Sequence, residues 1–336
     1  MSLQHPVPPR PAAPEPQGWI AVRVAHRESL GADIVGLQLV AEGDVPLPPA
    51  EAGAHIELAL PNGLRRCYSL CNPPGPVTAY ALGVLRDAAS RGGSRCVHAE
   101  LLPGTGLWIR PPRNLFPLPA QGPVCLLAGG IGITPLLAMA EQLHAEGRDF
   151  RLHYACRSRA RAAFLPQLAA APWAARVQLH FDDGPPAQRL SLDAVLGPFD
   201  GARHLMVCGP AGLIDAALAR AAALGWPEAH RHAERFAAAP AAAERAAEGG
   251  FEVVLARSGR VVPVPAGRSV AACLIAAGVP LPLSCEQGIC GTCAVRVLDG
   301  EPDHRDLVFT AAEQAANTHF TPCCSRAKSA RLVLDL

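Results

Sequence analysis

The sequence predicts a chain of several domains: an antiparallel β-barrel, then a doubly wound α/β domain, then a smaller α+β domain. Two observations support this. Short β-rich runs give way after residue 121 to longer apolar runs that alternate with helical stretches, and a cysteine-rich loop lies near the end of the chain. With 336 residues, half of them hydrophobic, the chain is long enough for two or three domains of roughly 100–200 residues each. We expect a disordered leader at 1–17, the barrel at 18–119, the α/β domain at 120–237, a linker at 238–250 and the last domain at 251–336.

The barrel is predicted from short runs such as residues 19–24 and 55–60, which are rich in β-branched and other apolar residues. Gly, Pro and Asn separate these runs, as turns between short strands require. This spacing is typical of a small antiparallel barrel.

The α/β domain begins with the continuous apolar run 124–128, which is typical of a buried parallel strand. A helix is expected directly afterwards, with Thr134 as its N-cap, Pro135 at its first position, residues 136–143 as its apolar face and Gly147 at its end. Further strands are expected at 150–156, 176–181 and 204–208.

The last domain is separated from the α/β domain by an Ala- and Glu-rich stretch, which we interpret as a linker with partial helicity. Strands are expected at 252–256 and 260–264, and a short helix near 269–277.

The composition excludes some partners. The formal net charge is +1, Lys328 is the only lysine, and the arginines form no basic run, so nucleic acid is not an expected partner. Residues 1–17 are rich in proline and lack the apolar core of a signal peptide, and no later stretch approaches the roughly 18 apolar residues of a membrane span. We therefore expect a cytoplasmic protein with no membrane partner.

Four of the twelve cysteines follow a pattern that binds iron. Cys285, Cys290 and Cys293 have C-x4-C-x2-C spacing and Cys323 follows about thirty residues later, which is the plant-type [2Fe–2S] pattern. Zinc sites, the main alternative besides buried free cysteines, more often pair C-x2-C motifs. The adjacent Cys324 fits the spacing equally well, so the spacing alone does not decide which of the two is the ligand.

Two glycines in this loop have an expected role. Gly288 and Gly291 would let the backbone fold around the cluster, with N–H groups directed at its sulfurs.

A flavin site is predicted from Arg66, Tyr68 and Ser69, near the end of an expected strand. The arginine can pair with a phosphate, the tyrosine can lie against the isoalloxazine ring, and the serine can hydrogen-bond the N5 edge of that ring. Alone, these residues fit an ordinary half-buried strand as well. The stretch Gly92, Gly93 and Ser94 opens an expected helix, whose free N–H groups and dipole suit a phosphate.

A nucleotide site is predicted where residues 129–135 follow a strand and open a helix. Gly130 and Gly132 allow the backbone to approach a pyrophosphate, although Thr134 and Pro135 stand where a G-x-G-x-x-G fingerprint has its last glycine. A second candidate segment follows a later strand and consists of Cys208, Gly209 and Pro210; a buried strand cysteine is the alternative for Cys208.

The adenosine end of the nucleotide site is expected at Arg157, Ser158 and Arg159, which follow the strand at 150–156. They could hold a 2′-phosphate, or they could form a solvated loop. Phe236 is a candidate for a core position.

In these motifs the chain resembles the phthalate dioxygenase reductase family of the ferredoxin–NADP reductase superfamily. The likeness runs from about residue 18 to the end and includes the R-x-Y-S, G-x-G-x-T-P and C-G-P segments, residues 232–236, the cluster loop, and residues 303–306 and 325–330. Residues 154–161 resemble the vanillate O-demethylase reductase subgroup.

The resemblance implies a flavin barrel, a nucleotide domain and a β-grasp-like ferredoxin domain. It implies that Cys323 is the fourth ligand, that the flavin is FMN rather than FAD, and that NADH is favoured over NADPH. It also implies that Ser69, Thr134 and Cys208 belong to the reacting centre and that Phe236 approaches the flavin.

The expected function is electron transfer from NADH through the flavin and the cluster to a Rieske-type oxygenase or demethylase. A flavin converts the two-electron hydride into the single electrons that a [2Fe–2S] cluster accepts. Two alternatives remain: a reductase for another acceptor, such as a cytochrome or ferredoxin, and a redox-sensing iron–sulfur flavoprotein.

Overall fold

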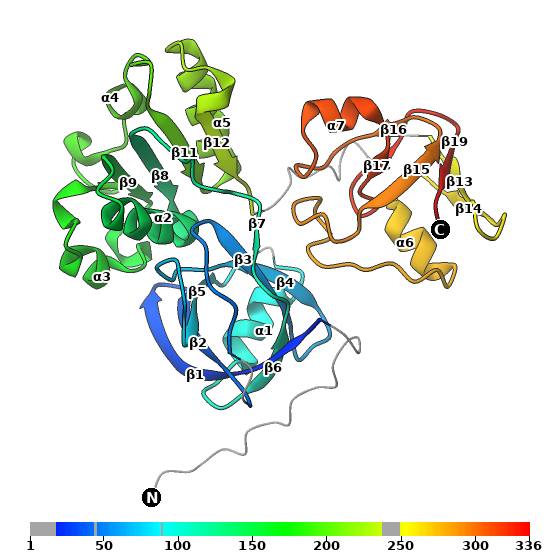
Figure 1. Ribbon diagram of the computed structural model, residues 1–336, viewed down its shortest axis with the longest axis horizontal. Helices are drawn as coiled ribbons and strands as arrows, with labels where there is room; N and C mark the ends of the chain where they lie inside the picture. The colour runs from blue at the N-terminus through cyan, green and yellow to red at the C-terminus, as the bar shows by residue number, and fades with distance from the viewer. Residues whose placement is uncertain (1–17, 44–45, 89, 237–248) are drawn as a thin grey trace, which may run out of the picture. The chain divides into compact units, whose positions relative to one another are not determined.

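The computed structural model describes residues 18–43, 46–88, 90–236 and 249–336 (Figure 1). The chain forms two compact units, whose boundary in the sequence falls between Glu234 and Arg235. The leader expected at 1–17 and most of the linker expected at 238–250 lie outside the described residues. None of the helices in the described ranges combines the length and apolar character needed to cross a membrane.

The first part of the chain is an antiparallel sheet whose strands run in the order β4-β3-β6-β1-β2-β5, with β7 paired to β3. A bridge between Leu70 and Leu82 and a hydrogen bond from the Cys71 N–H to the Ala81 carbonyl (2.9 Å) join the two outer strands, so the sheet closes into the expected barrel. Its elements are β1 (Ile20–Gly31), β2 (Ile34–Ala41), β3 (Ala54–Ala59), β4 (Arg65–Ser69), β5 (Ala79–Leu85), α1 (Gly93–Glu100), β6 (Gly106–Ile109) and β7 (Arg113–Asn114).

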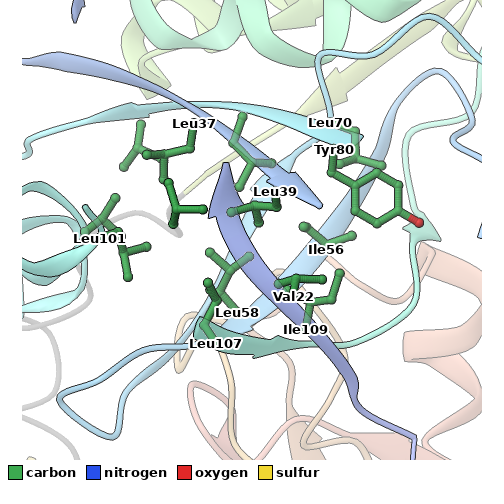
Figure 2. Close-up of a cluster of buried hydrophobic side chains, with 14 of the residues drawn as sticks. Val22, Leu37, Leu39, Ile56, Leu58, Leu70, Tyr80, Leu101, Leu107 and Ile109 are labelled. Atoms are coloured by element: carbon green, nitrogen blue, oxygen red, sulfur yellow. The ribbon is translucent and has the colours of Figure 1, made fainter. Parts of the chain in front are cut away.

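The barrel core is formed by the inward side of these strands (Figure 2). In β1, Val22 and Val24 are buried while the residues after each of them are exposed, which is the period of two that places alternate side chains inside. Tyr80 is fully buried, and its hydroxyl donates to the Pro48 carbonyl at 2.6 Å. Helix α1 adds the buried Val97 to the same core.

The second part is a parallel sheet in the order β10-β9-β8-β11-β12. The strand order reverses between β8 and β11, and ligands of doubly wound sheets bind at the carboxyl ends of the strands beside such a reversal. The elements are β8 (Val124–Gly129), α2 (Ile133–Ala145), β9 (Phe150–Cys156), α3 (Leu165–Ala170), β10 (Val177–Phe181), α4 (Leu192–Leu196), β11 (His204–Cys208), α5 (Ala211–Ala223) and β12 (Arg231–Glu234), with 3-10 turns at Gly130–Gly132, Arg159–Arg161, Ala174–Arg176, Pro186–Gln188 and Glu228–His230.

The start of α2 differs from the prediction. The turn Gly130–Gly132 winds as a 3-10 helix and continues directly into α2, so the helix begins at Ile133 and Gly132 occupies the N-cap. Thr134 is therefore the second helical residue rather than the N-cap, its hydroxyl donating to the Ile131 carbonyl at 3.0 Å, and Pro135 is the third rather than the first. The end is as expected, because Gly147 has a positive φ of 66° just after α2.

The third part is a five-stranded mixed sheet in the order β14-β13-β19-β15-β17, with a separate pair formed by β16 and β18. Ser269 caps α6 by accepting the Ala272 N–H at 3.2 Å, and Thr310 and Glu313 form a capping box at α7. The elements are β13 (Phe251–Leu255), β14 (Val261–Val264), α6 (Val270–Ala276), β15 (Val295–Asp299), β16 (Pro302–Asp303), α7 (Ala311–Ala316), β17 (His319–Phe320), β18 (Arg326–Ala327) and β19 (Arg331–Leu334).

Candidate flavin, nucleotide and cluster sites

The structure brings Arg66 of β4 against the first residue of α1. A Cβ atom added at Gly93 would lie 2.7 Å from Cγ and 2.8 Å from Nε of Arg66, so only glycine leaves room for the arginine side chain at this helix start. No side chain caps α1, and its N-cap Gly92 is left-handed, with a φ of 107°. A guanidinium beside uncapped helix N–H groups is an arrangement that binds a phosphate.

Hydrogen bonds from side chains hold the turn that leads into α1. Ser94 accepts the Asp87 N–H at 3.1 Å, Ser90 accepts the Gly92 N–H at 3.2 Å, and Asn62 donates to the Gly92 carbonyl at 3.4 Å. The three predicted residues Gly92, Gly93 and Ser94 therefore lie together at one fixed turn.

The other two residues of the flavin motif lie at the end of β4. Tyr68 is half-buried, and burial raises the pKa of its phenol. Ser69 is buried, and its hydroxyl donates to a carboxylate oxygen of Glu234 at 3.5 Å. This contact joins the barrel to the end of β12, across 165 positions of sequence.

The two predicted nucleotide motifs meet at the carboxyl ends of β8 and β11. A Cβ at Gly132 would lie 2.2 Å from the Cys208 carbonyl oxygen, and a Cβ at Gly209 would lie 2.9 Å from the Gly129 Cα. A Cβ at Gly129 would lie 2.8 Å from Cδ of Pro210. Glycine is needed here because two backbone turns pack directly against each other at the strand reversal, where doubly wound sheets bind nucleotides.

Thr134 also contacts the barrel. A Cβ at Gly83 of β5 would meet both the Thr134 methyl and the ring of Phe164 at 3.0 Å. Phe164 holds a left-handed φ of 61°, which is unfavourable for a bulky residue and is kept only where surrounding contacts fix it. These contacts fix the nucleotide turn relative to the flavin barrel.

Glu234 was not singled out in the sequence. The pairing of β11 with β12 sets Cys208 opposite Glu234, and Ser69 reaches the same carboxylate. Burial raises the pKa of Glu234 to about 8, and the hydrogen bond from Ser69 acts in the opposite direction. Burial, followed by the charge of Glu234, raises the pKa of Cys208 well above its usual value. The position of Glu234 at the carboxyl end of a parallel strand is the signal that could have marked it.

The remaining predicted nucleotide and flavin residues lie as follows. Arg157 and Arg159 are exposed just after β9, with Ser158 half-buried between them, and the Arg157 carbonyl accepts the Asp183 N–H at 3.2 Å. Phe236 is half-buried and belongs to the second compact unit.

The four predicted cluster ligands are buried together in the second unit. The Cys323 thiol interacts with those of Cys285 and Cys293, and the contact with Cys285, the largest cause, raises the pKa of Cys323. The Cys285 thiol also interacts with that of Cys290, which raises its own pKa. Thiols crowded in this way resist ionising together, and ferric ions would supply the opposing positive charge.

The loop around these thiols also fits a cluster. Backbone N–H groups of Gln287 and Ile289 point at the Cys285 sulfur, at 3.3 and 3.5 Å. Gly288 and Gly291 have φ values of 71° and 68°, and a Cβ at Gly288 would lie 2.3 Å from the Cys324 sulfur. The sulfur of Cys324, the other candidate for the fourth ligand, lies 3.1 Å from the Thr321 hydroxyl. Thiol donors and backbone N–H groups directed at a sulfur are the chemistry that would hold a [2Fe–2S] group.

The barrel, the doubly wound sheet with its strand reversal and the four-thiol loop together define a flavin- and nicotinamide-dependent reductase with an iron–sulfur domain. Residues 253–328 match the family model of the 2Fe-2S iron-sulfur cluster binding domain. Over 318 residues the chain is 51% identical to the vanillate O-demethylase oxidoreductase of Pseudomonas sp. (strain HR199 / DSM 7063), covering 94% of this chain and 100% of that protein. It is 40% identical over 325 residues to the phthalate dioxygenase reductase of Burkholderia cepacia, with 96% and 99% covered.

Two solved structures extend the likeness. The structure of phthalate dioxygenase reductase, described as modular for electron transfer from pyridine nucleotides to [2Fe–2S], has 40% identity and a TM-score of 0.73 over 95% of this chain and 98% of that one. An intact type IV self-sufficient cytochrome P450 monooxygenase has 39% identity and a TM-score of 0.83 over 97% of this chain and 43% of that one.

The chain belongs to the phthalate dioxygenase reductase family. It is therefore an oxidoreductase that transfers electrons with a flavin, a nicotinamide cofactor and a [2Fe–2S] cluster. The expected fold class and family are confirmed.

Proposed function

We propose that the chain is the reductase component of a two-component Rieske-type aromatic oxygenase or demethylase, and that it moves electrons from NADH through FMN and the cluster to the oxygenase. The observation that carries the proposal is the likeness to a vanillate O-demethylase oxidoreductase over nearly the whole of both chains. The chain also combines candidate flavin, nucleotide and cluster sites. A bound flavin accepts a hydride and releases single electrons, which links the nucleotide to the cluster.

The flavin phosphate is held by Arg66 and the start of α1 at Gly92, Gly93 and Ser94. Tyr68 lies against the isoalloxazine ring, and Ser69 faces its N5 edge. The preference for FMN over FAD rests on the likeness to phthalate dioxygenase reductase.

The nucleotide lies over the turn of Gly130 and Gly132, where Thr134 and Pro135 begin α2, and its nicotinamide lies by Cys208, Gly209 and Pro210. The packing of these two turns against each other supports this placement. Arg157 lies beside the adenosine ribose.

The contact of Ser69 with Glu234 would connect the N5 edge of a bound flavin to a group that can carry a proton. With a pKa raised to about 8, Glu234 is mostly protonated at neutral pH, so it would be a neutral partner for the Ser69 hydroxyl and could donate a proton through it, becoming a carboxylate as it does so. Cys208, fully buried beside it, stays a neutral thiol and excludes water from the reacting face.

Cys285, Cys290, Cys293 and Cys323 hold the cluster iron; the interaction of the Cys323 thiol with those of Cys285 and Cys293 supports this ligand set. We expect C323S to lose most of its iron and C324S to retain it. No disulfide joins any of the twelve cysteines, all of which lie within the described residues; this fits a reducing compartment and supports a cytoplasmic location.

The acceptor is tested by supplying NADH and the purified protein anaerobically to a Rieske oxygenase or, separately, to a P450 haem domain. The likeness to a self-sufficient P450 makes the haem acceptor the second candidate. Reduction of the Rieske centre at a rate that supports turnover is the expected result. Reduction of the haem alone, with ferricyanide reduction showing that the reductase is active, would assign the other acceptor.

A further inference from the structure

Asp306 lies in the second unit, close to the cluster loop, and is not one of the proposed ligands. Its side chain is fully buried. One carboxylate oxygen accepts the N–H groups of Val308 and Phe309, at 3.1 and 2.9 Å. The other accepts the Ser325 hydroxyl and the Nδ1–H of His304, both at 3.4 Å. Burial of a carboxylate destabilises the fold unless the oxygens accept hydrogen bonds, and these four donors satisfy both oxygens of Asp306.

The bonds of Asp306 reach the turn that carries the fourth proposed ligand. Ser325, which is fully buried, also exchanges a hydrogen bond with Thr321 at 3.1 Å. Its backbone N–H donates to the Thr321 carbonyl at 3.0 Å, which closes the turn that holds Cys323 and Cys324. Asp306 is therefore tied by one hydroxyl to the Cys323 turn.

The same segment also holds the loop of the first three ligands. The Leu307 N–H donates to the Gly288 carbonyl at 2.8 Å. Gly288 packs so closely that an added Cβ would lie 3.1 Å from the Asp306 Cα. The segment at Asp306 is thus the piece of chain that contacts both the 285–293 loop and the 321–325 turn.

We propose that Asp306 is a positioning residue of the cluster: through Ser325 and the Leu307–Gly288 bond it fixes Cys323 at the correct distance from the other three ligands, and its charge lowers the cluster potential. The inference rests on the proposed ligand set. Removing a carboxylate near the cluster favours the more negatively charged, reduced state.

The test uses the full-length protein with its cluster and flavin bound. D306N keeps the side-chain size and removes the charge, whereas S325A removes only the bridging hydroxyl. D303N is the matched control, because Asp303 lies in the same segment and its partly buried carboxylate pairs with the Arg305 guanidinium rather than with Ser325. The measurements are the rate of iron loss to a chelator, the EPR spectrum of the dithionite-reduced cluster and the cluster midpoint potential.

Iron loss about tenfold faster than in the wild type is expected for both D306N and S325A, with altered EPR g values, since removing groups behind metal ligands commonly costs 10–100-fold in metal affinity. The potential should rise in D306N more than in S325A, a difference that a general loss of stability would not produce. D303N should match the wild type. If D306N does not fold, S325A carries the test.

Wild-type iron retention and wild-type EPR spectra in both variants would overturn the proposal. A wild-type protein that binds no [2Fe–2S] cluster would instead overturn the proposed function. The reduction of flavin by NADH, which belongs to the other unit, should be unchanged in all three variants.

Discussion

Replacing Gly132 by alanine should slow flavin reduction severely while leaving the cluster intact. The new Cβ would lie 2.2 Å from the Cys208 carbonyl oxygen and 2.4 Å from its carbon, whereas real contacts essentially never fall below 3.0 Å. The β8 turn and the end of β11 must therefore separate by about 0.8 Å, and because both sides are backbone, no rotamer change can absorb the shift. Overpacking of this kind costs about 1–3 kcal/mol.

The kinetic effect should exceed the effect on stability. Cys208 and Pro210 border the proposed nicotinamide position, and a misplacement near 1 Å can cost about a hundredfold in rate. We therefore expect G132A to slow flavin reduction between about tenfold and a hundredfold, measured as bleaching of flavin absorbance after anaerobic stopped-flow mixing with NADH.

The matched control is G212A in α5. No atom lies within 4 Å of a Cβ at Gly212, and alanine favours a helix by about 0.8–1 kcal/mol relative to glycine. G212A should reduce its flavin at the wild-type rate. If G132A did the same, the placement of the nucleotide at this pair of turns would be refuted.

Two further predictions concern pH and docking. The raised pKa of Glu234 means that between about pH 4.5 and 8 the folded chain keeps a proton that the unfolded chain has lost, so its contribution to stability declines through this window and is lowest above pH 8. The Tm of E234Q minus that of the wild type should therefore increase from pH 5 to pH 9; a constant difference would show that the carboxyl is not desolvated. The Leu307 side chain is 51% exposed next to the cluster loop, so L307E should lower reduction of the oxygenase about tenfold without changing ferricyanide reduction. L298E, at a Leu 46% exposed on β15, is the control, and an equal loss in both variants would argue against docking at Leu307.

Much of the fold could be predicted because its signals are local. Apolar runs marked the strands at 150–156 and 204–208, whose bounds the structure reproduces, and the spacing of Cys285, Cys290 and Cys293 marked a loop that the structure folds with buried thiols. The start of α2 was predicted wrongly because a threonine before a proline is typical of a cap, whereas the glycine turn had already entered a 3-10 helix.

What could not be predicted depends on contacts between residues far apart in the sequence. Glu234 gains its raised pKa from burial at the folded end of β12, and the hydrogen bond that lowers this pKa comes from Ser69, 165 positions away in the sequence. Gly83 is an ordinary strand residue until Thr134 and Phe164 pack against it. Spacing left Cys323 and Cys324 equivalent, so the prediction of Cys323 depended on the family resemblance; the interaction of its thiol with those of Cys285 and Cys293 arises only in the folded turn.

The central claim is that one chain carries electrons from NADH through a flavin to a [2Fe–2S] cluster. The most direct test is an anaerobic titration of the purified protein with NADH and, separately, with NADPH, following flavin absorbance and the EPR signal of the reduced cluster. The account predicts that NADH bleaches the flavin rapidly and that the cluster signal follows, with NADPH much slower. A cluster that stayed oxidised while the flavin was fully reduced would contradict the electron path.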